Sequence, residues 1–243
     1  MPYPYEVLFS IGKLNVFTYG VFVLIAFFVS LWISLRRRKE ISVDDVYNLN
    51  IILLVAAIIG ARIAYILTNL QYYRTFYDVV ALWQGGLSFY GGFALALISS
   101  YTYIRIKKLD FWKVADTFAP AFALAMAIGR FGAFLSGVNP GTVTEVPWAI
   151  FHEGSLRHPT ALYNSLANLV IFFIILGLEK SDKKKLRIRK EGFYFLLVAF
   201  LMGLERFALD FFRAYESSFL VLLSRIMPLL IIFVALILIF RRR

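Results

Sequence analysis

Seven apolar runs, each about long enough to cross a bilayer, constrain this chain more than any other feature of its sequence. The runs are centred near residues 25, 57, 95, 126, 168, 202 and 230, and we expect the first span to run from Asn15 to Leu35. A helix needs about 20 apolar residues to cross the hydrocarbon core of a membrane. Apolar residues make up 60% of the chain, which contains 25 Phe, and this is far from the composition of an ordinary soluble domain. The sequence therefore predicts an all-α polytopic membrane protein, with seven transmembrane helices in a single transmembrane domain over residues 1–243.

The basic residues fall mainly on one side of the predicted membrane. Of the 26 Lys and Arg, 18 lie in four clusters that follow the first, third, fifth and seventh runs, namely Arg36–Lys39, Arg105–Lys113, Lys180–Lys190 and Arg241–Arg243. Loops on the cytoplasmic side of membrane proteins carry such an excess of Lys and Arg. We therefore expect the N-terminus outside the cell and the C-terminus in the cytoplasm. The net charge of +11 is placed to suit anionic membrane lipids, and we expect no nucleic-acid partner.

Two segments on the expected outer side are too polar to cross the membrane. Residues 69–84 are rich in Tyr and read as an interfacial segment, and residues 138–158 form the longest outer loop. The chain has no Cys, so a disulfide, a thiolate nucleophile and a cysteine metal site are all excluded. Its two histidines, His152 and His158, do not form a zinc pattern. We expect no metal and no cofactor.

A face of small residues marks the end of the fourth run. Its members recur at helical spacing and are Gly129, Gly132, Ala133, Ser136 and Gly137. Each glycine inside a helix in water costs about 1 kcal/mol relative to Ala. In a membrane, the same face lets a second helix backbone come close. We therefore predict a close helix contact here, and another at Gly60-Ala61 in the second run.

Several charged residues lie inside apolar runs. An arginine within a membrane costs roughly 3 kcal/mol on insertion scales, so such residues usually face a wet cavity or the bundle interior. Arg62 and Arg130 are two of these, although Arg130 is also close enough to the end of its run to reach the interface. The sixth run carries four more, Glu205, Arg206, Asp210 and Arg213. Arg206 and Asp210 are four residues apart and can pair on one helix face.

The third run opens with four glycines within eight residues, Gly85, Gly86, Gly91 and Gly92. Uncovered backbone amides at such a stretch can bind an anion or permit a sharp entry turn. Tyr19 lies in the outer turn of the first run, where an aromatic ring with a polar tip suits the membrane interface.

Four motifs in this order resemble the prolipoprotein diacylglyceryl transferase family. They are Gly86–Gly92, Gly129–Gly137, Arg157–Tyr163 and Gly203–Arg213, and Tyr19-Gly20 and Gly60–Arg62 also resemble that family's first two spans. The resemblance covers nearly the whole chain. It implies a multi-pass enzyme of the bacterial inner membrane. Such an enzyme moves the diacylglyceryl group of phosphatidylglycerol to the lipobox cysteine thiol in a prolipoprotein signal peptide, and releases glycerol phosphate.

The resemblance and the chemistry together indicate the site residues. Guanidinium groups suit a phosphate whose charge grows during the reaction, and an electropositive site favours a thiolate. The catalytic candidates are Arg130, Arg206, Tyr90 and His158, the last two as proton handlers. The candidates for substrate binding are Tyr19, Arg62, Gly91, Gly92, Gly132, Ser136, Asp210 and Arg213.

The chain also departs from the family's usual pattern. Tyr90 stands where the family usually has His, and Ala133 and Ser136 stand where it usually has Asn. These differences leave open a catalytically degenerate or altered-specificity homologue that binds phospholipid. A third hypothesis is an anion or lipid transporter that uses the arginines for permeation. Transporters of that kind are built from inverted repeats, and we find none in the run of spans.

Overall fold

The structure is a computed structural model. It describes the following residues: 4–12, 14–38, 41–73, 75–81, 85–152, 154–184, 189–214 and 218–241. Residues 74 and 82–84 of the predicted interfacial segment, residue 153 of the predicted outer loop, and parts of three predicted basic clusters lie outside the described residues.

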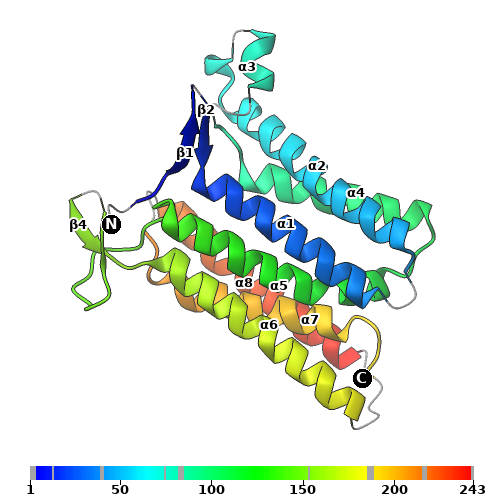
Figure 1. Cartoon of the computed structure of the whole chain (residues 1–243). Coiled ribbons are helices and arrows are strands. Elements are labelled where there is room, and N and C mark those ends of the chain that lie inside the picture. The colour runs from blue at the N-terminus through cyan, green and yellow to red at the C-terminus, as the bar shows by residue number, and fades with distance from the viewer. Residues whose placement is uncertain are drawn as a thin grey trace. The chain divides into compact units, whose positions relative to one another are not determined.

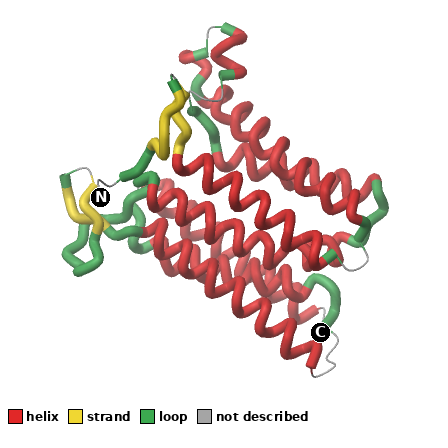
Figure 2. The backbone as a smooth tube through the Cα atoms, viewed as in Figure 1, coloured by secondary structure: helices red, strands yellow, loops and turns green. Residues whose placement is uncertain are grey.

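Helices make up most of the described chain, with two short β-hairpins beside them (Figures 1 and 2). The long helices are α1 (Thr18–Arg37), α2 (Val43–Thr68), α4 (Phe89–Ile106), α5 (Phe111–Leu135), α6 (Thr160–Lys184), α7 (Phe193–Asp210) and α8 (Ser218–Arg241). The short elements are β1 (Val7–Ile11), β2 (Leu14–Phe17), η1 (Leu70–Tyr72), α3 (Phe76–Val80), β3 (Ile150–His152) and β4 (Ser155–Arg157).

Five of these helices are long and apolar enough to cross a membrane, counted over the described residues. They are α1, α2, α5, residues Thr160–Asp182 of α6 and residues Ser224–Arg241 of α8. These match the first, second, fourth, fifth and seventh apolar runs. The third and sixth runs form α4 and α7, which are more polar: α4 carries three Tyr and Arg105, and α7 carries Glu205, Arg206 and Asp210. The prediction of an all-α membrane protein is therefore confirmed, with five candidate spanning helices among the described residues.

The start of the first predicted span differs from expectation. That span was expected from Asn15, but residues up to Phe17 lie in strand β2, which pairs antiparallel with β1, and the helix begins at Thr18. The Ser10 hydroxyl donates to the Asn15 side-chain oxygen across this hairpin at 2.8 Å. A second hairpin, β3–β4, forms within the predicted outer loop. Both hairpins are too short for their alternation to stand out against the longer apolar runs.

The chain divides into two compact units, residues 38–114 and residues 1–37 with 115–243. In the first of these, α2 packs on α4 through small residues. A Cβ atom added to Gly60 would overlap the Gly91 carbonyl oxygen, and one added to Gly92 would lie 2.7 Å from the Ala57 carbonyl oxygen. The close contact predicted at Gly60-Ala61 is therefore confirmed.

The other unit is a bundle of α1, α5, α6, α7 and α8 (Figure 1). One buried apolar cluster joins four of these helices through residues such as Ile33, Ala121, Ile175 and Val198. The α6 side chain of Ser165 donates to the Ala127 carbonyl oxygen of α5 at 2.8 Å. These contacts fix α5 and α7, which carry the charged residues of the candidate site.

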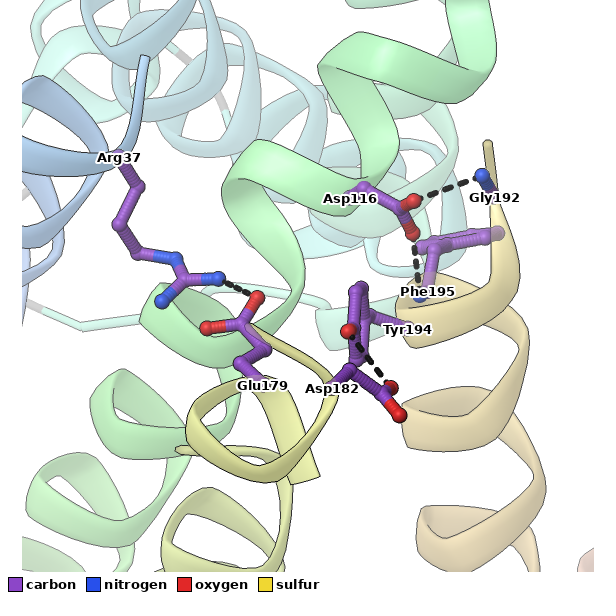
Figure 3. Close-up of polar contacts among 7 residues, drawn as sticks. All are labelled: Arg37, Asp116, Glu179, Asp182, Gly192, Tyr194 and Phe195. Carbon is purple, nitrogen blue, oxygen red and sulfur yellow. Dashed lines mark hydrogen bonds and ion pairs between the residues drawn. The ribbon is translucent and has the colours of Figure 1, made fainter. Parts of the chain in front are cut away.

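A polar cluster holds one end of this bundle together (Figure 3). The Asp116 carboxylate of α5 accepts hydrogen bonds from the backbone N–H groups of Gly192, at 2.7 Å, and Phe195, at 2.8 Å. Gly192 is the N-cap residue of α7 and offers no side-chain cap of its own. Beside this contact, Glu179 pairs with Arg37 of α1. Asp116 therefore fixes the first turn of α7 by supplying the acceptors that the helix start lacks.

Candidate functional site

Three helices bring charged side chains together in the larger unit. The Arg130 guanidinium of α5 lies within electrostatic range of Arg206 and Glu205 of α7 and of Tyr19 of α1. The Glu205 carboxylate is also within range of Arg213, three residues beyond the end of α7. We call these five residues the arginine–glutamate cluster. With all groups ionised, three arginines and one glutamate give it a net charge of +2, which suits an anion.

Glu205 is the member of this cluster that was noted in the sequence as a charged residue of the sixth run but was not among the predicted site residues. Its Oε1 atom is buried and has no hydrogen-bond partner among the described residues. A buried polar atom without a partner costs about 1–3 kcal/mol, so such atoms often mark a site that a ligand or a reacting group completes. Its sequence signal is an acidic residue next to an arginine in an apolar run. In the described part of the chain, no three His, Asp or Glu side chains gather as metal ligands would.

Gly132, a predicted substrate-binding residue, lies where α5 approaches α1, and Ser136, another, lies one residue beyond α5. A Cβ atom on Gly132 would overlap the side chain of Phe22 in α1. The Ser136 hydroxyl is buried and donates to the Gly132 carbonyl oxygen of its own helix at 2.7 Å. The close approach explains how Arg130, two residues before Gly132, comes within range of Tyr19 on the neighbouring helix.

The end of α7 is tied to α8 and to the loop before α6. The buried Asp210 carboxylate pairs with Arg225 of α8, whose Nε lies 3.2 Å from Oδ2. The contact with the arginine of α8 was not foreseen from the sequence, and the predicted pairing of Arg206 with Asp210 stays a prediction. Arg213 forms an isolated antiparallel β-bridge with Gly141, and the Thr142 N–H donates to the Phe212 carbonyl oxygen at 2.9 Å.

His158, a predicted proton handler, lies in an aromatic group next to this bridge. Its Nδ1 is 3.2 Å from the Tyr163 hydroxyl, which also accepts a hydrogen bond from the Trp148 ring N–H at 2.6 Å. The His158 ring meets the Phe212 ring edge-on, with 5.0 Å between centroids. His158 is therefore positioned by neighbours that hold its ring and one of its nitrogens.

Arg62 lies in the other unit, and its guanidinium is surrounded by backbone carbonyl groups. The side chain is buried and donates through Nε to Val79 at 2.9 Å and through Nη1 to Gly85 at 2.6 Å. Further hydrogen bonds go to the carbonyl oxygens of Asp78, Gly86 and Ala81. In this structure Arg62 therefore holds the backbone that leads into α4 through these hydrogen bonds, and we call this arrangement the Arg62 clamp.

Tyr90, Gly91 and Gly92 lie on the first turn of α4 in the same unit. Tyr90 is 69% exposed, and Gly91 and Gly92 lie at the contact with α2. Gly85 and Gly86 have φ angles of 82° and 80°, so the glycine stretch includes the sharp turn that the sequence suggested. The role of Tyr90 as a proton handler stays a prediction.

Comparison with known proteins identifies the family. Residues 6–241 match the prolipoprotein diacylglyceryl transferase family. The chain belongs to this family. The resemblance seen in the four motifs is therefore confirmed.

Curated relatives with the name phosphatidylglycerol–prolipoprotein diacylglyceryl transferase match most of the chain. The Geobacter sulfurreducens protein is 33% identical over 230 residues, which cover 90% of this chain and 86% of that protein. The Finegoldia magna protein is 35% identical over 182 residues, covering 74% and 73%. The Thermosynechococcus vestitus protein is 32% identical over 217 residues, covering 84% and 80%.

Within this family, the unusual residues of the chain occupy ordinary packing positions. Ala133 is 2% exposed in α5, and the Ser136 hydroxyl is bonded to its own helix. The departures from the family pattern at Ala133 and Ser136 therefore fall on buried positions of the chain.

Proposed function

We propose that the protein transfers the diacylglyceryl group of phosphatidylglycerol to the lipobox cysteine thiol of prolipoproteins and releases glycerol phosphate. The observation that carries this proposal is the arginine–glutamate cluster, in which Arg130 and Arg206 come from two different helices of a chain of this family. A site with a net positive charge and a buried carboxylate matches the two needs of the reaction, which are to hold a phosphate and to take up a proton.

The phosphate side of the reaction needs the arginines. The thiolate attacks the glyceryl carbon that is bonded to the phosphate oxygen, so a C–S bond forms and the C–O bond breaks with its electron pair on that oxygen. The leaving group changes from a singly charged diester to a monoester that carries close to two charges at neutral pH. Guanidinium groups offer paired donors for this growing charge, and we assign this role to Arg130 and Arg206, with Arg213 beside them.

The thiol proton needs an acceptor. A free thiol has a pKa of about 8.5, and a positive environment favours its thiolate. Tyr90 and His158 remain proposed proton handlers, and Glu205 joins them because its Oε1 is buried and unpartnered among the described residues while its carboxylate lies within range of Arg130. Arg62, Gly91 and Gly92 contribute through the backbone that leads into α4.

The finer topology also belongs to this proposal. We propose seven spans, with α4 and α7 completing the five apolar helices, an outer N-terminus and a cytoplasmic C-terminus. The protein then acts as a single multi-pass domain of the bacterial inner membrane, with the interfacial segment 69–84 and the loop 138–158 on the outer side. Its partners are phosphatidylglycerol, the signal peptide of a prolipoprotein and membrane lipids.

The direct test is transfer by the purified chain. The assay uses phosphatidylglycerol micelles and a synthetic lipobox peptide, and mass spectrometry measures the mass of the peptide. We expect a diacylglyceryl adduct on the peptide cysteine, and none on a peptide with Ser in its place. Complementation of a strain depleted of its own transferase tests the same activity in cells. Binding of phosphatidylglycerol without any transfer, in both tests, would favour the degenerate homologue instead.

A further inference from the structure

A second group of arginines lines an open cavity at the end of α7. The cavity has a volume of about 510 Å³ and is lined by side chains that include Arg157, Asp210, Phe211, Arg213 and Arg225. These residues come from β4, from the end of α7 and from α8. Arg157 and Arg225 are absent from the roles assigned above.

The walls of this cavity are built by several backbone and side-chain contacts. The Arg157 guanidinium donates to the Gly141 carbonyl oxygen at 3.2 Å, and Gly141 forms the β-bridge to Arg213. A Cβ atom on Gly141 would lie 2.6 Å from the Phe212 carbonyl oxygen, so the loop at Gly141 and the residues just beyond α7 pack backbone against backbone. Arg157 and Arg213 therefore lie on connected pieces of chain.

Arg225 completes the group from α8. Its Nε donates to Asp210, its guanidinium carbon lies 4.8 Å from the centre of the Phe211 ring, and its side chain is still 42% exposed. Asp210 is buried with a side-chain exposure of 0%. The carboxylate thus holds one edge of the guanidinium while a large part of the group remains open to the cavity.

The charge and polarity of the lining indicate the ligand. Three arginines and one aspartate give a net charge of +2, which matches a doubly charged phosphate monoester better than a singly charged diester. The lining also includes four apolar side chains, Val143, Phe211, Ala214 and Val221, so the charge of the lining is the property that favours the monoester. A signal peptide has a positively charged start, and this cavity would repel it.

We propose that this cavity binds glycerol phosphate, the monoester that the reaction releases, on its way out of the site. Arg213 belongs both to the cavity lining and to the arginine–glutamate cluster, so the two positive regions are joined at one residue. The inference rests on the proposed function, because that reaction supplies the monoester. Glycerol phosphate and the headgroup of phosphatidylglycerol share the glycerophosphate group. The experiment must therefore distinguish binding of the free product from binding of the lipid headgroup.

The test is a titration of the purified full-length chain in a neutral detergent, without any acceptor peptide. Isothermal titration calorimetry measures the dissociation constant of glycerol phosphate, with glycerol as a control ligand and dioctanoyl phosphatidylglycerol as a competitor. The variants are Arg157→Gln, Arg225→Gln and Arg225→Lys. Arg241→Gln is the matched control, because it removes the same charge from the exposed last turn of α8.

We expect binding by the wild type that weakens with salt, and a loss of roughly fivefold or more in affinity for Arg157→Gln and for Arg225→Gln. Arg225→Lys should lose less, since it keeps the charge, and Arg241→Gln should bind as the wild type does. If Arg225→Gln does not fold because Asp210 loses its contact with Arg225, Arg157→Gln decides the question.

Three results would overturn the proposal: no binding of glycerol phosphate, an equal loss in Arg241→Gln, or tighter binding of the short-chain lipid at the same arginines. The last of these would assign the cavity to the incoming lipid headgroup. Because no acceptor peptide is present, the titration is independent of turnover. Binding without transfer would count against the proposed function alone, and transfer without binding would count against the cavity alone.

Discussion

Gly132 of α5 lies so close to Phe22 of α1 that a Cβ atom at Gly132 would sit 2.8 Å from the Phe22 ring carbon Cγ and would overlap its Cβ. Gly129, one turn earlier on the same helix, faces open space, with nothing within 4 Å of such an atom. Both glycines belong to the face of small residues seen in the sequence, but only Gly132 makes the close contact.

The first prediction compares alanine at these two glycines. Gly132→Ala should lower the free energy of unfolding by about 1–3 kcal/mol, because the added methyl group must push α1 and α5 apart. Gly129→Ala should be neutral or stabilising, since alanine is the better helix former. Thermal unfolding in detergent, followed by circular dichroism, measures both. Equal losses in the two variants would contradict the contact.

The second prediction concerns the clamp formed by Arg62. Arg62→Lys keeps the charge but cannot reach carbonyl oxygens in two directions, because an ammonium group lacks the planar fork. We expect the free energy of unfolding to fall by about 2 kcal/mol, as buried carbonyl groups lose their donor. Hydrogen exchange around Val79 and limited proteolysis of the segment before α4 should both become faster. Arg105→Lys, at an exposed position of α4, is the control and should change neither measurement.

Arg62 also shows which features of the structure could be predicted from the sequence and which could not. Its burial was predicted, since an arginine in an apolar run must find partners inside the protein. Its partners are carbonyl groups 16 to 24 residues away, and their positions depend on the turn made by Gly85 and Gly86. No local pattern in the sequence specifies that turn closely enough to assign the hydrogen bonds.

The third prediction concerns the cap that Asp116 provides for α7. Asp116→Ala should cost about 0.5–2 kcal/mol of stability, the usual effect of losing a helix cap. It should also speed hydrogen exchange at the Gly192 and Phe195 amides, which bond to this carboxylate. Asp116→Asn keeps one oxygen acceptor and should lose less. Glu145→Ala removes an exposed acidic side chain from a loop and serves as the control. Unchanged exchange at both amides in Asp116→Ala would exclude the cap.

The fourth prediction concerns the paired donors of Arg130. Arg130→Lys retains the positive charge but loses the planar pair of N–H donors of the guanidinium group. We therefore expect kcat/KM for transfer to fall by roughly 100-fold or more. The same loss is expected for Arg206→Lys. Arg241→Lys, at the exposed end of α8, should transfer at the wild-type rate. Near-normal transfer by Arg130→Lys would mean that charge alone is sufficient at this position.

The charged residues of α7 show a second limit to what could be predicted from the sequence. Their spacing indicated a functional helix end, and the structure brings Glu205 and Arg206 within range of Arg130. The contact between Asp210 and Arg225 was not foreseen, because Arg225 reaches Asp210 from α8, fifteen residues along the chain. Only the packing of α7 on α8 brings these two residues together. Gly203 permits that packing, since a Cβ atom there would lie 2.8 Å from Ile232.

The last prediction separates two proposed proton acceptors. A phenol has an unperturbed pKa of about 10 and is a poor base near neutral pH. If Tyr90 only donates a hydrogen bond to a lipid oxygen, Tyr90→Phe should transfer within about fivefold of the wild-type rate. Tyr90→His should also be active, because it restores the family's usual residue. A loss of about 100-fold or more in Tyr90→Phe would instead identify the phenol as the base.

Glu205→Gln is the counterpart of that test, because glutamine keeps the shape of glutamate and cannot take up the proton. If Glu205 is the acceptor, the rate at neutral pH should fall by about 100-fold or more. It should then recover as the pH rises toward the ordinary thiol pKa of about 8.5, since the thiolate forms without help. If Glu205 only balances the arginines, removing its charge makes the site more positive, which favours the thiolate and leaves the rate unchanged or higher. The pH–rate profile of Glu205→Gln on the lipobox peptide therefore gives opposite results for the two roles of the carboxylate. The profile of Tyr90→Phe, measured beside it, tests the phenol.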